Sequence, residues 1–171
     1  MKFPIVVAML AATHVAAAAP PLDLIDTPAE LTPSAAWQAI DVPASTGAST
    51  VIGAWRGPGG VTAAITRIAV GNPRAWSSTK RPAYLTEVIA GFAAVATAMP
   101  RTATPPGPVP TLDVDFTRTT PREQVAARVL LFRTYTLVLT VAGPAATMRA
   151  VSRDVTQLRA SFALPAGWSP G

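Results

Sequence analysis

The chain has 171 residues, 50% of them hydrophobic, which predicts one domain with a sizeable core. Its 14 Lys and Arg residues exceed its 9 Asp and Glu residues by 5, and they are spread along the chain, so the charge does not mark a basic patch. There is no cysteine, which excludes disulfides, thiol catalysis, zinc–thiolate sites and a cysteine-linked lipid anchor.

The N-terminal segment has the three parts of a secretory signal peptide: a positive start at Lys2, an apolar run and small residues at its end. Because Pro20 disfavours cleavage directly before it, we expect cleavage after Ala18, with residues 1–18 as the signal peptide and a secreted or periplasmic mature protein. The alternative is an uncleaved membrane anchor, for which the 17-residue run from Phe3 to Ala19 is short and interrupted. No stable membrane span is expected after cleavage.

The one histidine, His14, lies within the predicted signal peptide, so the mature chain would have neither His nor Cys. This removes Ser-His-Asp triads, Cys-His pairs, imidazole metal sites and acid–base catalysis by His. We therefore expect a protein that is not an enzyme and that uses no cofactor or metal.

Residues 19–36 hold several prolines among scattered acids and predict an irregular lead-in or a tether. Residues 37–42 form a possible first strand. Residues 49–56 and 61–70 flank a Gly-Pro-Gly-Gly sequence, which predicts a β-hairpin. Small residues on these strands would let a helix approach the sheet closely, and they are Gly53, Ala54, Ala63 and Ala64.

A helix is predicted over residues 82–99, because Pro82 suits a first helical position and apolar residues recur at helical spacing. The apolar stripe is formed by Leu85, Val88, Phe92, Val95 and Met99. Residues 101–110 predict an extended, proline-rich loop. Residues 111–117 alternate and predict a strand, with Asp113 and Asp115 on a solvated face.

The last third predicts two strands over 125–132 and 135–141, joined as a hairpin, and then a helix that starts at Gly143-Pro144. The apolar stripe of that helix is formed by Met148, Val151, Val155, Leu158 and Phe162. The element order predicts a single α+β domain over residues 37–164, a mostly antiparallel β-sheet with two amphipathic helices packed on it. Residues 165–171 form a C-terminal tail.

Three predicted features follow one another along the chain. They are a helix that contains Tyr84–Phe92, a strand–Gly-Pro–helix junction at Val141–Thr147, and a terminal helix that ends at Leu158–Phe162. Over roughly Trp37 to Leu164 this order resembles the PsbP-like α/β/α sandwich proteins, which include photosystem II extrinsic subunits and bacterial periplasmic DcrB-like proteins. The resemblance implies a compact accessory or binding domain that acts through its surface. Metal contacts described in that family rely partly on His, so no functional residue transfers to this chain.

The sequence Ser77-Ser-Thr-Lys80 matches the Ser-x-x-Lys motif of penicillin-recognising enzymes. In those enzymes the Lys lies one helical turn after the Ser, whereas Pro82 here indicates a helix that starts after the Lys. The chain also lacks the Ser-Asp-Asn and Lys-Thr-Gly elements. We expect a polar loop at this position.

Asp113 and Asp115 lie two residues apart on one strand face, a pattern that could indicate a cation site. Two carboxylates give fewer oxygens than Ca²⁺ or Mg²⁺ needs, so we expect a cross-strand ion pair with an Arg such as Arg118 or Arg128.

Trp55-Arg56 and Phe132-Arg133 place aromatic residues beside cations, as single-strand nucleic-acid binders do. Two isolated pairs without a basic run are weak evidence for that function, and an exported protein would not meet nucleic acid. No nucleic-acid partner is expected.

The sequence thus predicts an exported accessory or binding domain that acts through contacts with a protein partner. The candidate contact residues lie outside the predicted apolar core, and they are Trp168, Arg128, Arg133, Arg149 and Arg153. Trp168 either packs back onto the domain or stands exposed as an aromatic anchor. The alternative function is a carrier of a small apolar ligand held between the sheet and the helices.

Overall fold

The computed structural model describes residues 22–24, 27–42, 48–74, 77 and 80–169. The predicted signal peptide, residues 1–18, lies outside the described residues. In the described part of the chain, no helix is both long and apolar enough to cross a membrane.

The centre of the fold is a seven-stranded sheet in the order β3-β4-β5-β9-β8-β7-β6, and every neighbouring pair is antiparallel. This confirms the predicted α+β class. The strands are β3 (Gln38–Ala39), β4 (Ser49–Arg56), β5 (Thr62–Ala69), β6 (Ala96–Ala103), β7 (Thr111–Arg118), β8 (Glu123–Leu131) and β9 (Tyr135–Gly143).

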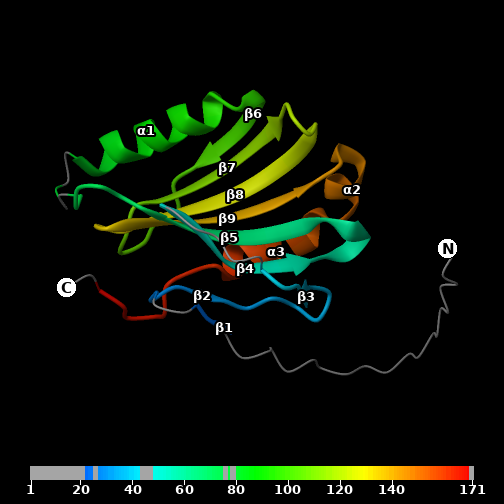
Figure 1. The fold of residues 1–171 in the computed structure, drawn as a ribbon, viewed down its shortest axis with the longest axis horizontal. Helices are drawn as coiled ribbons and strands as arrows, with labels where there is room; N and C mark the ends of the chain where they lie inside the picture. Colours follow the sequence, from blue (N-terminus) through cyan, green and yellow to red (C-terminus); the bar gives the residue numbers. More distant parts are fainter. Residues whose placement is uncertain (1–21, 25–26, 43–47, 75–76, 78–79, 170–171) are drawn as a thin grey trace, which may run out of the picture.

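Helices cover both faces of the sheet, so the domain has three layers (Figure 1). On one face lies helix α1 (Lys80–Ala93), whose Leu85 and Val88 pack on Leu112 and Val129 of the sheet. Helices α2 (Ala145–Ala150) and α3 (Ser152–Ser161) pack on the opposite face. Successive residues of a strand point to opposite faces, which is why one strand contributes to both layers.

The predicted helix over 82–99 is too long at its C-terminal end. The structure ends α1 at Ala93, and the chain continues as β6, which pairs with β7. Val95, expected in the helical stripe, is 53% exposed. Strand pairing overrides the helical spacing here, and Pro100 is tolerated because β6 is an edge strand, where a missing N–H breaks no ladder on the outer side.

The predicted C-terminal helix is two helices, because the chain breaks at Val151 (φ −106°, ψ 20°). The apolar stripe nevertheless continues across the break. Met148 of α2, Val155 and Leu158 of α3, and Phe162 after α3 are buried in the core between these helices and the sheet.

The lead-in, predicted as irregular, contains two short strands in its described part, and several of its side chains lie in the core. Strand β1 (Leu22–Asp23) pairs with β2 (Glu30–Leu31), and Glu30 exchanges two backbone hydrogen bonds with Ala163 after α3. The side chains of Leu31 and Trp37 are buried. The segment therefore closes the sheet face beside α3.

Two glycines of the β4–β5 hairpin allow close packing, but of different partners. A Cβ at Gly53 would lie 2.5 Å from the Trp55 ring, so this glycine makes room for an indole and not, as predicted, for a helix. A helix does approach at Gly59, where a Cβ would lie 2.7 Å from Thr147 of α2 and the φ of +67° also favours glycine.

Val155→Asp tests the position of α3. A carboxylate at this 5% exposed site would be buried without a partner, so we expect the free energy of unfolding to fall by at least about 3 kcal/mol in urea denaturation. Arg153→Asp, on the exposed side of the same helix, is the control and should stay within about 0.5 kcal/mol. Equal stability of the two variants would contradict the helix placement.

Candidate protein-contact surface

The turn of the β8–β9 hairpin carries a cluster of aromatic rings. Phe132 and Tyr135 flank the turn, and their rings stack with centroids 4.6 Å apart. Trp168, from the C-terminal tail, packs edge-on against Phe132 with centroids 5.9 Å apart. Phe132 is buried, whereas Tyr135 and Trp168 are half-buried. The tail therefore packs back on the domain, and its indole still reaches solvent.

Arginine side chains from two other segments hold this turn. The guanidinium carbon of Arg67 on β5 lies 4.7 Å from the centre of the Tyr135 ring. Arg74 donates hydrogen bonds from Nη1 to the carbonyl oxygens of Phe132 (2.6 Å) and Tyr135 (3.0 Å). Its Nη2 donates to Oγ1 of Thr136 at 2.8 Å. The turn conformation is thus fixed by side chains from a segment that lies far away in the sequence.

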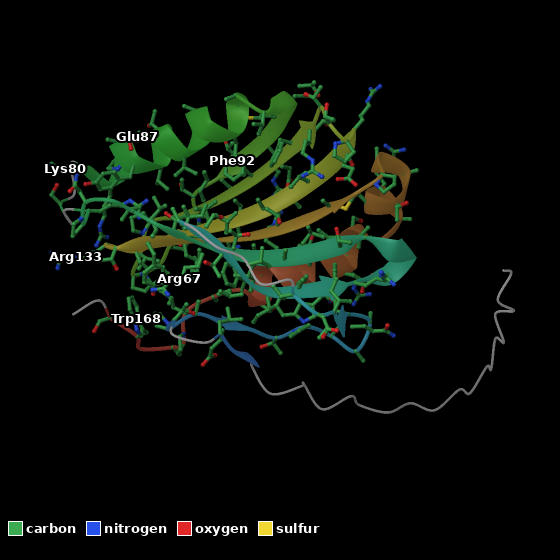
Figure 2. The ribbon with its side chains drawn as sticks, viewed as in Figure 1. Arg67, Lys80, Glu87, Phe92, Arg133 and Trp168 are labelled. Atoms are coloured by element: carbon green, nitrogen blue, oxygen red, sulfur yellow. The ribbon has the colours of Figure 1, made fainter. Side chains whose placement is uncertain are left out.

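We call Arg67, Arg74, Arg133, Tyr135 and Trp168 the hairpin-tip surface. Figure 2 shows Arg67, Arg133 and Trp168 at one end of the molecule, with Lys80 at the same end. Arg133 lies in the turn itself and is exposed. This end of the fold therefore presents cationic groups beside two partly exposed aromatic rings.

The environment of this surface changes the acidity of two of its groups. Burial raises the pKa of the Tyr135 hydroxyl, and the charge of Arg67 opposes that rise in part. Burial lowers the pKa of Arg74, an effect opposed by Tyr84 and Glu87. Arginine starts from so high a value that Arg74 remains a cation at neutral pH.

Of the predicted contact residues, only Trp168 and Arg133 belong to the hairpin-tip surface. Strand β9 runs from Tyr135 at the turn to Gly143, directly before α2. Arg149 on α2 and Arg153 near the start of α3 are exposed, but they belong to the helices that follow the opposite end of that strand. The structure therefore does not bring the predicted residues together in one patch.

Arg128 is part of the fold and is not free to contact a partner, contrary to the prediction. Its Nε and Nη2 donate to the two carboxylate oxygens of Asp113, each at 2.7 Å, and Arg128 and Asp113 are direct partners in the β7–β8 register. Its Nη1 also donates to the carbonyl oxygens of Ala160 (3.3 Å) and Phe162 (3.4 Å) at the end of α3. The expected cross-strand ion pair is confirmed, with Arg128 as the cation.

The sequence predicted a solvated face for Asp113 and Asp115, and this is wrong, because α3 covers that face and both carboxylates are paired with arginines. Asp115 forms an ion pair with Arg159 of α3, and Arg159 is a buried residue with 8% of its surface exposed. Among the described residues, no group of three or more His, Cys, Asp or Glu side chains could hold a metal ion.

The two other sequence patterns have structural explanations in the described residues. Oγ of Ser77 accepts a hydrogen bond from the backbone N–H of Lys80 (3.2 Å), the first residue of α1, as a helix cap does. Ser78 and Thr79 lie outside the described residues. Trp55 is buried, so its ring is not available for stacking on a base.

The sequence did not reveal the contributions of Arg67, Arg74 and Tyr135 to the hairpin-tip surface. Arg67 meets Tyr135 because β5 pairs with β9, where Ala69 is opposite Tyr135 and Arg67 is its diagonal neighbour. Nothing in the sequence specifies that these two strands pair. The available signal was limited to an Arg near the end of one strand and a Tyr at the start of another.

Replacement of Arg128 with Met tests its structural role. The Arg128 and Asp113 side chains are only 14% and 16% exposed, so Asp113 would be left partly buried without its cation. We expect a loss of about 2–4 kcal/mol in the free energy of unfolding. Arg133→Met, in the exposed turn, is the control and should change stability by less than about 0.5 kcal/mol. Equal losses in the two variants would show that the ion pair contributes nothing.

The raised pKa of Tyr135 predicts a fall in stability at high pH. The unfolded chain loses the tyrosine proton first, near pH 10, so the unfolded state binds fewer protons above that pH and stability falls as pH rises. Below about pH 10 the contribution is fully present. Urea denaturation at several pH values should show a smaller alkaline fall for Tyr135→Phe than for the unmodified protein. Tyr84→Phe, which replaces the other tyrosine, is the control, and a fall reduced only in that variant would contradict the assignment.

No protein-family model and no curated protein sequence matches the chain. The resemblance to PsbP-like proteins rests on element order and stays a prediction. What the protein does must therefore be inferred from the chemistry of its own residues.

Proposed function

We propose that the protein is an exported, non-catalytic accessory domain that binds another protein through the hairpin-tip surface. The observation that carries the proposal is the meeting of Trp168, Tyr135 and Arg67 around one turn, with Arg133 exposed beside them. Trp, Tyr and Arg are the residue types that contribute most often to hot spots in protein interfaces.

The fixed positions of these side chains support a binding role. The Tyr135 ring stacks on Phe132 and also contacts the Arg67 guanidinium, and Trp168 packs against Phe132. Side chains that are already fixed lose little conformational entropy when a partner covers them. The surface is thus preorganised for contact, although its rings remain partly exposed.

The charge of this end of the fold favours an acidic partner. Arg67, Arg133 and Lys80 contribute cations here, and Glu87 on α1 contributes an acid (Figure 2). An excess of positive charge speeds association with an acidic surface, and this effect weakens as salt is added.

The wider context of the proposal comes from the sequence. The N-terminal segment predicts export to the periplasm or the medium, and a mature chain without His and Cys would lack the usual groups of nucleophilic and acid–base catalysis. A three-layer α/β/α fold is also what the PsbP-like resemblance would imply. Accessory domains of that kind act through surfaces.

Site-specific photo-crosslinking in the source cells tests the proposal. A photoreactive residue at position 133 should cross-link one acidic protein that the same residue at position 153, exposed near the start of α3, does not capture. With that protein purified, Arg67→Glu combined with Arg133→Glu should weaken binding at least about tenfold, and more at low salt than at high salt.

The control for charge is Arg153→Glu, which should bind the partner as tightly as the unmodified protein. Identical cross-linking from positions 133 and 153, or equal affinity of the charge-reversed and control variants, would refute the assigned surface. Native mass spectrometry of the protein from its own source should show no bound apolar molecule. A co-purifying apolar molecule would instead support the predicted alternative, a carrier.

A further inference from the structure

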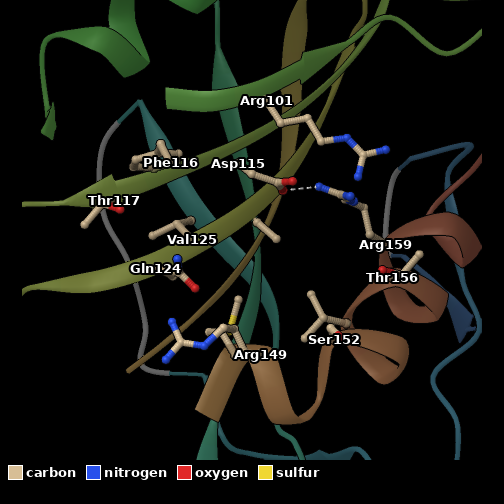
Figure 3. Close-up of a pocket in the computed structure, with 13 residues that line it drawn as sticks. Arg101, Asp115, Phe116, Thr117, Gln124, Val125, Arg149, Ser152, Thr156 and Arg159 are labelled. Carbon is tan, nitrogen blue, oxygen red and sulfur yellow. Dashed lines mark hydrogen bonds and ion pairs between the residues drawn. The ribbon is translucent and has the colours of Figure 1, made fainter. Parts of the chain in front are cut away.

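A second candidate site lies at the opposite end of β9 from the hairpin-tip surface. It is a cavity of about 300 Å³ between the sheet at β6, β7 and β8 and the helices α2 and α3 (Figure 3). Three arginines line it, from three different elements: Arg101 on β6, Arg149 on α2 and Arg159 on α3. Asp115 is the one acidic residue in the lining that the structure describes.

The arginines are not all balanced by acids. Arg159 forms an ion pair with Asp115, and Arg101 is the direct partner of Asp115 in the β6–β7 register. In the part of the chain that the structure describes, neither Arg101 nor Arg149 forms an ion pair. Three cations against one carboxylate leave the cavity with a net charge of +2. Like charges that share a cavity repel one another, and a bound anion would relieve that repulsion.

The cations lie at two ends of the cavity. Figure 3 shows Arg101 and Arg159 beside Asp115 on one side, and Arg149 beside Gln124 on the other. Apolar side chains, including Val125, Met148 and Val155, line the cavity as well, and the hydroxyl groups of Ser152 and Thr156 add hydrogen-bonding capacity. A cavity with polar groups at fixed points and apolar walls is the usual form of a small-molecule site.

We propose that this cavity binds a small organic dianion in which two carboxylates are separated by a short apolar chain. One carboxylate is received by Arg101 with Arg159, and the other by Arg149 with the amide of Gln124. Guanidinium groups suit this ligand because their paired N–H donors match the two oxygens of a carboxylate. The net charge of +2 matches a dianion, and the apolar wall matches the chain between its charges.

Isothermal titration calorimetry of the purified protein with glutarate, at neutral pH and low salt, tests the site. We expect 1:1 binding that is at least about tenfold tighter than binding of butyrate, which carries a single carboxylate. Arg101→Gln and Arg149→Gln should each weaken glutarate binding at least about tenfold. Both residues are exposed, so both variants should keep the melting temperature of the unmodified protein.

Arg153→Gln is the matched control, because Arg153 is an exposed α3 residue that does not line the cavity. It should bind glutarate as the unmodified protein does. No measurable heat with glutarate at about 10 mM, or equal weakening by the Arg149 and Arg153 variants, would overturn the proposal. Sulfate binding as tightly as glutarate would overturn the two-ended arrangement. Binding of a peptide with paired glutamates, without binding of glutarate, would overturn the assignment to a small molecule.

Discussion

The structure depends on strands β8 and β9 being buried on both faces. On β9, Leu137, Leu139 and Val141 face α2 and α3, while Val138 packs in the cluster under α1. On β8, Leu130 belongs to the core with α2 and α3, and Val129 packs in the cluster under α1. A strand with apolar residues on both faces is stable only if each face is covered, so these two strands require a layer on each side. The remaining strands extend the sheet on either side of this pair.

Arginine gives this fold its buried charges. Arg128 of β8 and Arg159 of α3 lie between the sheet and α3, and each neutralises one aspartate of β7. The guanidinium of Arg128 also donates to backbone carbonyls at the end of α3, which a lysine ammonium would not do in the same fixed geometry. Because each charge has a partner, the polar side of β7 can lie under a helix without unpaired carboxylates.

The strongly patterned parts of the chain were predictable from sequence. Strand β7 and the β8–β9 hairpin were found because alternation and β-branched residues agree there. Strand β6 was not predicted, because Met99 continues the helical spacing and a proline-rich stretch follows from Arg101, and only pairing with β7 makes these residues a strand. The break at Val151 was missed because the apolar stripe runs through it. Alternation identifies the two faces of a strand, but it does not show whether a helix covers the polar one.

The candidate site was predictable only in part, for a related reason. Arg128 and Arg133 look alike in the sequence, and their roles differ because the register places Arg128 opposite Asp113 while Arg133 falls in the turn. Register depends on contacts between distant segments, and a single sequence does not display them. Trp168 and Arg133 were found because aromatic and cationic residues outside every apolar stripe have no obvious place in the core. Arg67 and Tyr135 are brought together only by the pairing of β5 with β9, which the sequence does not specify.

The edges of the sheet determine whether a partner protein could bind by adding a strand. Of the strands that the structure describes, β3 and β6 are the first and last in the sheet order, and β3 pairs only with Trp55 and Arg56 of β4. Strand β3 has two residues, and β6 contains Pro100 and two register shifts against β7. Short edges, prolines and bulges prevent edge-to-edge pairing. In the proposed function, side chains make the contacts with a partner, and the hairpin-tip surface gathers side chains that suit this role and are already held in place.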